Sequence, residues 1–247
     1  MTADATPLEL EIARRLETVQ QRMAVAAHNA GRSPQTVQLV AVSKRQPAKK
    51  LLAAVKAGVR VLGENYVKEG LEKRQQVNAW LEEQAIALPQ WHMIGHVQRR
   101  KARLVVEHFD AVESLDREEL ADELDRRAER AGSRMKVLLQ VNLSGEAQKN
   151  GVAEGAVEEL AAHCLERRHL EPVGLMTVPA ANPDPEASRA SFARLREVRD
   201  RLQQRPGAEA IQELSMGMSG DFEIAIEEGA TLIRVGTALF GPRDDSA

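Results

Sequence analysis

Residues 37–44 read VQLVAVSK, a short apolar run that ends in a lysine. A run of this length, rich in valine and leucine, predicts a β-strand of a parallel sheet that is covered on both faces. Because side chains alternate along a strand, Val42 and Lys44 lie on one face and Ala41 and Ser43 on the other. If the first face points into a barrel, Lys44 lies at the mouth of that barrel.

Seven further runs of this kind follow at intervals of about 28 residues, close to the length of a βα unit. Stretches with helical periodicity separate them, such as residues 47–56, which end before Gly58 and place Leu51 and Val55 on one face. Eight strands at this spacing predict an α/β fold, a single (β/α)8 TIM barrel. The seven further runs begin at Val59, Trp91, Ala111, Met135, Val173, Ile211 and Thr231.

The ends of the chain complete the predicted organisation. An extra helix over residues 8–29 is expected to cover the open N-terminal end of the barrel or to pack on its flank. Only ten residues follow Thr237, so we expect no second domain after the barrel. One domain is therefore expected over residues 1–247, with tails at residues 1–7 and 243–247.

Composition narrows the classes of function. The 34 Lys and Arg residues nearly balance the 37 Asp and Glu residues, so the net charge of −3 and the 3% aromatic content argue against nucleic-acid binding. No stretch approaches the length of a membrane span, and the N-terminus lacks a signal peptide. A single cysteine, Cys164, rules out an internal disulfide bond and fits the cytoplasm. We expect a cytoplasmic protein without membrane or nucleic-acid partners.

Lys44 is the first candidate for chemistry. Active sites of TIM barrels lie at the C-terminal ends of the strands, which is where the first run ends. A lysine amine partly withdrawn from water is able to attack a carbonyl carbon and form a Schiff base. From its position alone, the alternative that Lys44 is an ordinary loop cation stays open.

The last two strands predict an anion site. Residues 215–221 read SMGMSGD ahead of a helix, for which Ser219 is the expected N-cap. The final strand ends in Arg234, Gly236 and Thr237. TIM barrels often bind phosphate with the loops after strands seven and eight, because free amides and a helix N-terminus favour an anion. The alternative to an anion site is that the glycines in these loops only form tight turns.

Four other side chains have a weaker basis. Asn65 follows the second strand and either binds a ligand or caps the next helix. His92 and His96 lie in the third run, and without a third ligand they make no metal site, so we expect no metal. Cys164 falls on an apolar helical face, which predicts a packed core residue.

Several long motifs in the same order then resemble one known family. From about residue 39 to residue 242 the chain is similar to the pyridoxal phosphate homeostasis proteins, the YggS/PROSC family. The motifs that carry the resemblance are VAVSK ending at Lys44, GENYV from Gly63, WHMIG from Trp91, GLMTV from Gly174, LSMGMSGDFEIAI from Leu214, and IRVGTALFG.

This resemblance implies a barrel like the N-terminal domain of alanine racemase, with pyridoxal 5′-phosphate (PLP) bound as an aldimine to Lys44. The expected cofactor-binding residues are Lys44, Asn65, His92, Ser215, Ser219, Arg234, Gly236 and Thr237. Arg234 would meet either the phosphate or the pyridine nitrogen. The chain departs from the family at residues 95–101, which read GHVQRRK where the family has GPLQSNK. Only the local loop shape and charge are put in doubt there.

Three functions remain in view. A carrier would hold PLP reversibly in vitamin B6 homeostasis and pass it to apoenzymes, without catalysis and as a monomer. An amino-acid racemase needs a second acid–base group opposite the lysine, and the only candidates are the single tyrosine, Tyr66, and His92. A sugar-phosphate enzyme would form its Schiff base on the same Lys44. Because we expect no second domain to supply the opposing group, the carrier is favoured.

Overall fold

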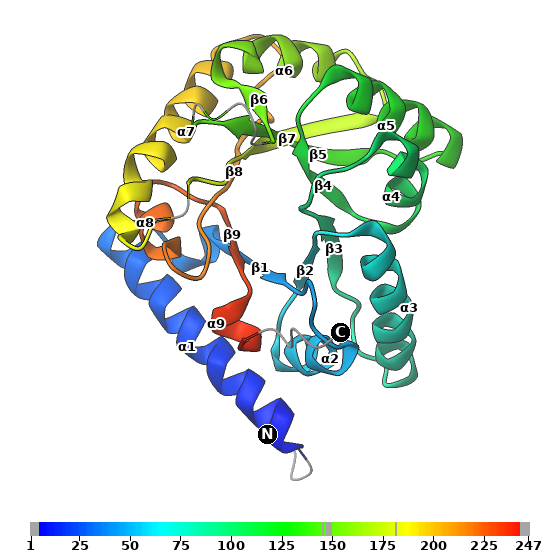
Figure 1. Cartoon of the computed structure of the whole chain (residues 1–247), viewed down its shortest axis with the longest axis vertical. Helices are drawn as coiled ribbons and strands as arrows, with labels where there is room; N and C mark the ends of the chain where they lie inside the picture. Colours follow the sequence, from blue (N-terminus) through cyan, green and yellow to red (C-terminus); the bar gives the residue numbers. More distant parts are fainter. Residues whose placement is uncertain (1–4, 145, 147–149, 181, 243–247) are drawn as a thin grey trace.

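The computed structural model describes residues 5–144, 146, 150–180 and 182–242. Within these residues, eight parallel strands form a ring with helices around its outside (Figure 1). The barrel strands are β1 (Gln38–Val42), β2 (Val61–Glu64), β3 (Gln90–Met93), β4 (Ala111–Leu115), β5 (Met135–Asn142), β7 (Leu170–Met176), β8 (Glu213–Ser215) and β9 (Leu232–Val235). The helices are α1 (Pro7–Asn29), α2 (Ala48–Ala57), α3 (Val67–Glu83), α4 (Ala102–His108), α5 (Glu118–Ala131), α6 (Val157–Leu165), α7 (Arg189–Leu202), α8 (Phe222–Glu227) and α9 (Thr237–Phe240).

The order of the strands confirms the predicted barrel. They run β4-β3-β2-β1-β9-β8-β7-β5, and pairing of β4 with β5 closes the ring. A two-residue strand, β6 (Val152–Ala153), pairs in parallel with the end of β5 and lies outside the expected set of eight. The chain therefore has the α/β fold of a (β/α)8 TIM barrel.

Two apolar layers lie on either side of the strands. Val40, Val61 and Leu138 pack together in one small cluster, whereas Ala41 and Leu62, one position away, belong to the large cluster that includes the helices. The alternation predicted for residues 37–44 is therefore confirmed, with Val40 on the barrel interior. Val42 and Lys44 follow Val40 at alternate positions, so their side chains also face the inside of the barrel, at its mouth.

Glycine ends two of the helices, and the first of these ends is the one predicted from the sequence. α2 ends at Gly58 with φ +121°, and α5 ends at Gly132 with φ +62°. Both angles lie in the region that side chains with a Cβ rarely adopt, so glycine lets the chain leave each helix and enter the next strand.

Helix α1 lies on the flank of the barrel, one of the two expected positions. It packs against α2, α8 and α9, and Figure 1 shows it running along the outside of the ring. Thr6 and Glu9 form a reciprocal capping box at its start. Thr6 and Pro7 therefore belong to the helix and not to a tail, while residues 1–4 and 243–247 lie outside the described residues.

The structure also bears on the predictions made for Cys164 and for membrane-spanning helices. Cys164 is completely buried on α6, and burial raises the pKa of its thiol to about 12, so it is a packed core residue as predicted. Of the helices that the structure describes, none has the length and apolarity of a membrane span.

Candidate functional site

A cavity of about 310 Å³ opens at the C-terminal ends of β1, β2, β8 and β9. This volume is at the lower end of the range for small-molecule pockets. Lysine, amide, hydroxyl and guanidinium groups line it together with a few apolar side chains, and none of the lining residues is acidic. The lining residues are Val42, Lys44, Asn65, Ile94, Val178, Met218, Ser219, Gly220, Arg234, Gly236 and Thr237.

The loops after β8 and β9 meet at Ser219. Its hydroxyl oxygen accepts hydrogen bonds at 3.3 Å from the backbone N–H groups of Gly236 and Ala238. Ser219 is therefore not the N-cap of α8, and that prediction is wrong. The chain makes one more turn over residues 218–221, so Asp221 becomes the N-cap residue and Ser219 serves the start of α9 instead.

Gly217 makes the turn after β8 possible. Its φ is +89°, and a Cβ at this position would lie 2.5 Å from the Cβ of Ala225 on α8. Any side chain would be strained here and would also push α8 away. The glycine thus keeps the loop close to the helix and holds Ser219 and Gly220 at the edge of the cavity.

A chain of buried polar groups leads from the cavity into the barrel. The guanidinium of Arg234 donates at 2.6 Å to the hydroxyl of Ser215 and at 2.7 Å to the carbonyl oxygen of Thr177. Ser215 donates at 2.5 Å to Glu113 Oε2, and His92 Nδ1 lies 2.7 Å from Glu113 Oε1. Glu113 and Ser215 are completely buried. The arginine is therefore fixed from below by a carboxylate two hydrogen bonds away.

Electrostatics in this chain follow from burial and pairing. Burial has the largest effect on the Glu113 carboxyl and would raise its pKa, but the hydrogen bonds and charges of His92, Arg234 and Ser215 together hold the pKa below its usual value. Burial lowers the pKa of Arg234, and the Glu113 carboxylate opposes that effect. A guanidinium stays charged in proteins, so Arg234 presents a cation to the cavity.

Asn65, which follows β2, also lines the cavity. Its side-chain oxygen, Oδ1, is buried and has no hydrogen-bond partner among the described residues. An unpaired buried acceptor costs about 1–3 kcal/mol, so its presence beside a cavity points to a ligand or water that donates to it. Tyr66 is the N-cap residue of α3 and makes no side-chain capping bond, so Asn65 does not cap this helix.

The structure brings together six of the eight residues expected from the sequence. Lys44, Asn65 and the four groups from the last two loops line one cavity, whereas His92 and Ser215 lie beneath it in the buried chain. Sequence reasoning missed Glu113, although a carboxylate inside the apolar run AVESL is a signal for a buried, paired acid. It also missed the apolar lining residues Ile94, Val178 and Met218.

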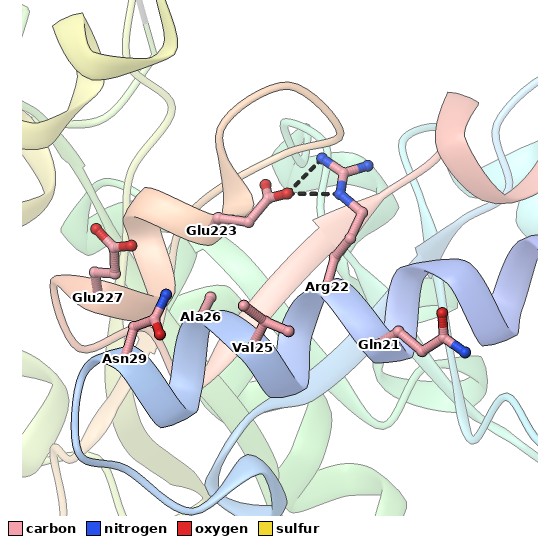
Figure 2. Close-up of a pocket in the computed structure, with 7 residues that line it drawn as sticks. All are labelled: Gln21, Arg22, Val25, Ala26, Asn29, Glu223 and Glu227. Atoms are coloured by element: carbon pink, nitrogen blue, oxygen red, sulfur yellow. Dashed lines mark hydrogen bonds and ion pairs between the residues drawn. The ribbon is translucent and has the colours of Figure 1, made fainter.

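Another cavity, of about 360 Å³, lies between α1 and α8 and shares no lining residue with the first. Figure 2 shows Arg22 of α1 reaching across it to Glu223 of α8, at 2.6 Å, and Arg22 also stacks over the ring of Phe222. These contacts join α1 to α8, and the charged groups of Arg22 and Glu223 that line this cavity pair with each other. Metal chemistry has no candidate, since the described residues contain no cluster of three or more possible ligands.

Comparison with known proteins identifies the family of the chain. Residues 15–244 match the family described as alanine racemase, N-terminal domain. A pyridoxal phosphate homeostasis protein of Vibrio alginolyticus is 42% identical over 236 residues, covering 95% of this chain and 99% of its own. The protein of the same name from Escherichia coli K12 is 38% identical over 240 residues, covering 96% and 98%.

Solved structures give the same result. PipY of Synechococcus elongatus PCC7942, solved with PLP bound, is 36% identical, has a TM-score of 0.80 and covers 93% of this chain and 100% of its own. Alanine racemase of Corynebacterium glutamicum, at 16% identity and a TM-score of 0.67, shares the fold, and the match covers 92% of this chain and 60% of that enzyme. The chain belongs to the pyridoxal phosphate homeostasis protein family, within the larger group of barrels that resemble the alanine racemase N-terminal domain.

Proposed function

We propose that this protein binds PLP in the cavity at the barrel mouth, holds it on Lys44 and serves in intracellular PLP homeostasis. The observation that carries the proposal is the convergence of Lys44, Arg234 and the Ser219–Thr237 edge on one cavity. This arrangement combines an amine, a fixed cation and hydroxyl groups. An aldehyde that also carries a phosphate matches that set of groups.

The covalent step needs only the lysine. The amine of Lys44 adds to the aldehyde carbon of PLP, one water molecule leaves, and a C=N bond remains. Addition of water reverses the reaction and returns the free aldehyde and the free amine. Storage and release therefore require no further reactant, as a reversible carrier demands.

The residues present fit the cofactor. The hydroxyl groups of Ser219 and Thr237 and the backbone of Gly220 and Gly236 form the edge suited to a phosphate. The unpaired oxygen of Asn65 is a further acceptor for a polar ligand. We assign the phosphate to this edge, and Arg234, held from below by Ser215, to either the phosphate or the pyridine nitrogen of the cofactor.

The two candidates for the second acid–base group of a racemase, Tyr66 and His92, are not among the residues that line the cavity. Tyr66 is 52% exposed. His92 is buried against Glu113. A racemase requires a second acid–base group facing the lysine across the substrate, and neither candidate is placed to serve. These positions favour a carrier that transfers PLP to apoenzymes and has no catalytic activity of its own.

The proposal retains the expectation of a monomeric cytoplasmic protein. Its partners would be PLP itself and, transiently, enzymes that lack their PLP. The alternatives to test are an amino-acid racemase with the same cofactor and an enzyme that forms a Schiff base with a sugar phosphate on Lys44.

The test is the visible absorption spectrum of the purified protein titrated with PLP. A carrier should show an imine band that saturates at one PLP per chain. The loaded protein should then restore activity to a PLP-dependent enzyme stripped of its cofactor, while racemising no amino acid. Racemisation that survives repeated purification and is lost in Lys44→Ala would establish the enzyme instead. A colourless protein would leave the sugar-phosphate alternative.

A further inference from the structure

A largely buried cluster of polar and charged groups behind β1 is not explained by the cavity itself. It consists of Ser43, Glu64, Glu69 and Lys73, contributed by the end of β1, the end of β2 and the first turns of α3. Lys73 is only 8% exposed, and Glu64 is completely buried. Ion pairs of this kind are costly to bury, so their place in the fold requires a reason.

The cluster binds the backbone on one side of Lys44. The ammonium of Lys73 donates to the carbonyl oxygen of Ser43 at 2.5 Å and to Glu64 Oε1 at 2.9 Å. Ser43 in turn donates its hydroxyl to the same Glu64 oxygen at 2.7 Å. The residue that precedes Lys44 is therefore held by both its main chain and its side chain.

The same cluster binds the backbone on the other side. Lys73 donates to Glu69 Oε1 at 2.6 Å, and this oxygen also accepts the backbone N–H of Arg45. Arg45 has φ +57°, a conformation that residues with a Cβ seldom adopt. A strained residue persists where its surroundings hold it, and the contact from Glu69 to its amide does so.

We propose that Lys73 is a positioning residue for Lys44: with Glu64 and Glu69 it fixes the peptide groups on both sides of Lys44, so that the amine meets the PLP aldehyde in a productive orientation. This inference rests on the proposed function. Lys73 lies on the outer side of the strand, opposite the face that carries Lys44, and takes no part in binding the phosphate. Its effect should therefore fall on formation of the imine and not on non-covalent binding.

The test separates these two steps with two ligands. PLP reports binding plus imine formation, whereas pyridoxine 5′-phosphate, which carries an alcohol in place of the aldehyde, reports binding alone. In Lys73→Met we expect the apparent affinity for PLP and the imine band to fall at least about tenfold, since small misplacements of a reacting group have effects of this size or larger. The dissociation constant for pyridoxine 5′-phosphate should change less than about twofold. Lys73→Arg, which keeps a cation there, should recover part of the imine band.

Two further variants serve as the control and as a second test. Lys56→Met removes a lysine that pairs with Glu9 at 3.1 Å and touches neither neighbour of Lys44, so both ligands should bind as in the wild type. If Lys73→Met fails to fold, Glu69→Ala decides, because Glu69 is a quarter exposed and its loss frees the amide of Arg45. It should show the same selective loss of the imine.

Three results would overturn the inference. Equal losses for both ligands would show that Lys73 only supports the fold, and no loss for either would show that Lys44 is positioned without it. Both results leave the proposed function intact, because the wild type still forms its imine. A wild-type protein that forms no imine with PLP would instead overturn the proposed function, and this inference with it.

Discussion

Arg234 and Ser215 are joined by a hydrogen bond of 2.6 Å from the guanidinium to the hydroxyl, deep in the barrel and directly beneath the cavity. The hydroxyl of Ser215 in turn donates a hydrogen bond to Glu113. The charge of the arginine at the cavity floor is thus balanced by a carboxylate that does not line the cavity. This relationship explains how a buried arginine keeps both its charge and its direction.

The first prediction concerns Arg234→Ala. Removal of the guanidinium leaves two buried acceptors, the carbonyl oxygen of Thr177 and the hydroxyl oxygen of Ser215, without the donor that now serves them, which costs about 1–3 kcal/mol. We expect the free energy of unfolding of the ligand-free protein to fall by about this amount in urea denaturation. Arg22→Ala, which removes a half-exposed pair with Glu223, should cost less than about 1 kcal/mol. Similar losses for the two variants would contradict the role given to Arg234.

The second prediction concerns pH. The pKa of Glu113 lies below its ordinary value of 4.5 in the folded protein, so its ionised form stabilises the fold above that value. This contribution is lost as pH falls through the lowered pKa. The difference in unfolding free energy between wild type and Glu113→Gln should be full at pH 7 and shrink below about pH 4.5. Urea denaturation at several pH values measures it, and a difference that grows on acidification would contradict the account.

The third prediction concerns Gly95. A Cβ at this position would lie 2.2 Å from the backbone oxygen of Asn65 and 2.6 Å from its Cα, too close for any rotamer to relieve. Gly95→Ala should therefore displace Asn65 and cost about 1–3 kcal/mol of stability. It should also weaken PLP binding, read by titration of the imine band.

Gly155 provides the control for this experiment. A Cβ there meets no atom within 4 Å, so Gly155→Ala should alter neither the melting temperature nor the affinity for PLP by much. Unchanged PLP binding in Gly95→Ala, despite a lowered melting temperature, would remove Asn65 from the cofactor site.

The fourth prediction concerns Lys44→Ala. Lys44 lies at the barrel mouth, beyond the layer of packed side chains that includes Val40, so Lys44→Ala should leave the ligand-free fold intact. A ligand that binds only the folded state raises its melting temperature. Thermal unfolding with and without PLP should thus show a rise for the wild type that is largely lost in Lys44→Ala. A variant that PLP stabilises as strongly as the wild type would show that Lys44 does not hold the cofactor.

The barrel was predictable because its signals are local and repeated. Each strand is a short run with a clear parity. Residues 37–44 put Lys44 on the same face as Val42, and the structure shows that this face is the inner one. The hydrogen bonding of Ser219 was not predictable from its own loop, because its hydroxyl accepts backbone N–H groups at the start of α9, a helix that begins 18 residues further along the chain. Local capping preference was overridden by a tertiary contact.

The buried acids show a different limit. Glu64 and Glu113 sit inside apolar strands, and the sequence marks them as unusual without naming their partners. Lys73 lies nine residues from Glu64 and meets it once α3 packs on β2, whereas Arg234 lies 121 residues from Glu113 and is brought near it only by the closed barrel. Pairings of this kind depend on the packing of helix against strand and of strand against strand, which no pattern along the chain encodes.

The central claim, that PLP is held on Lys44, is tested most directly by borohydride reduction of the PLP-loaded protein followed by mass mapping of its peptides. Reduction converts the imine into a stable secondary amine and marks the lysine that carried it. The account predicts a single labelled peptide, the one that contains Lys44. Label on another lysine, such as Lys101 or Lys149, with none on Lys44 would contradict it.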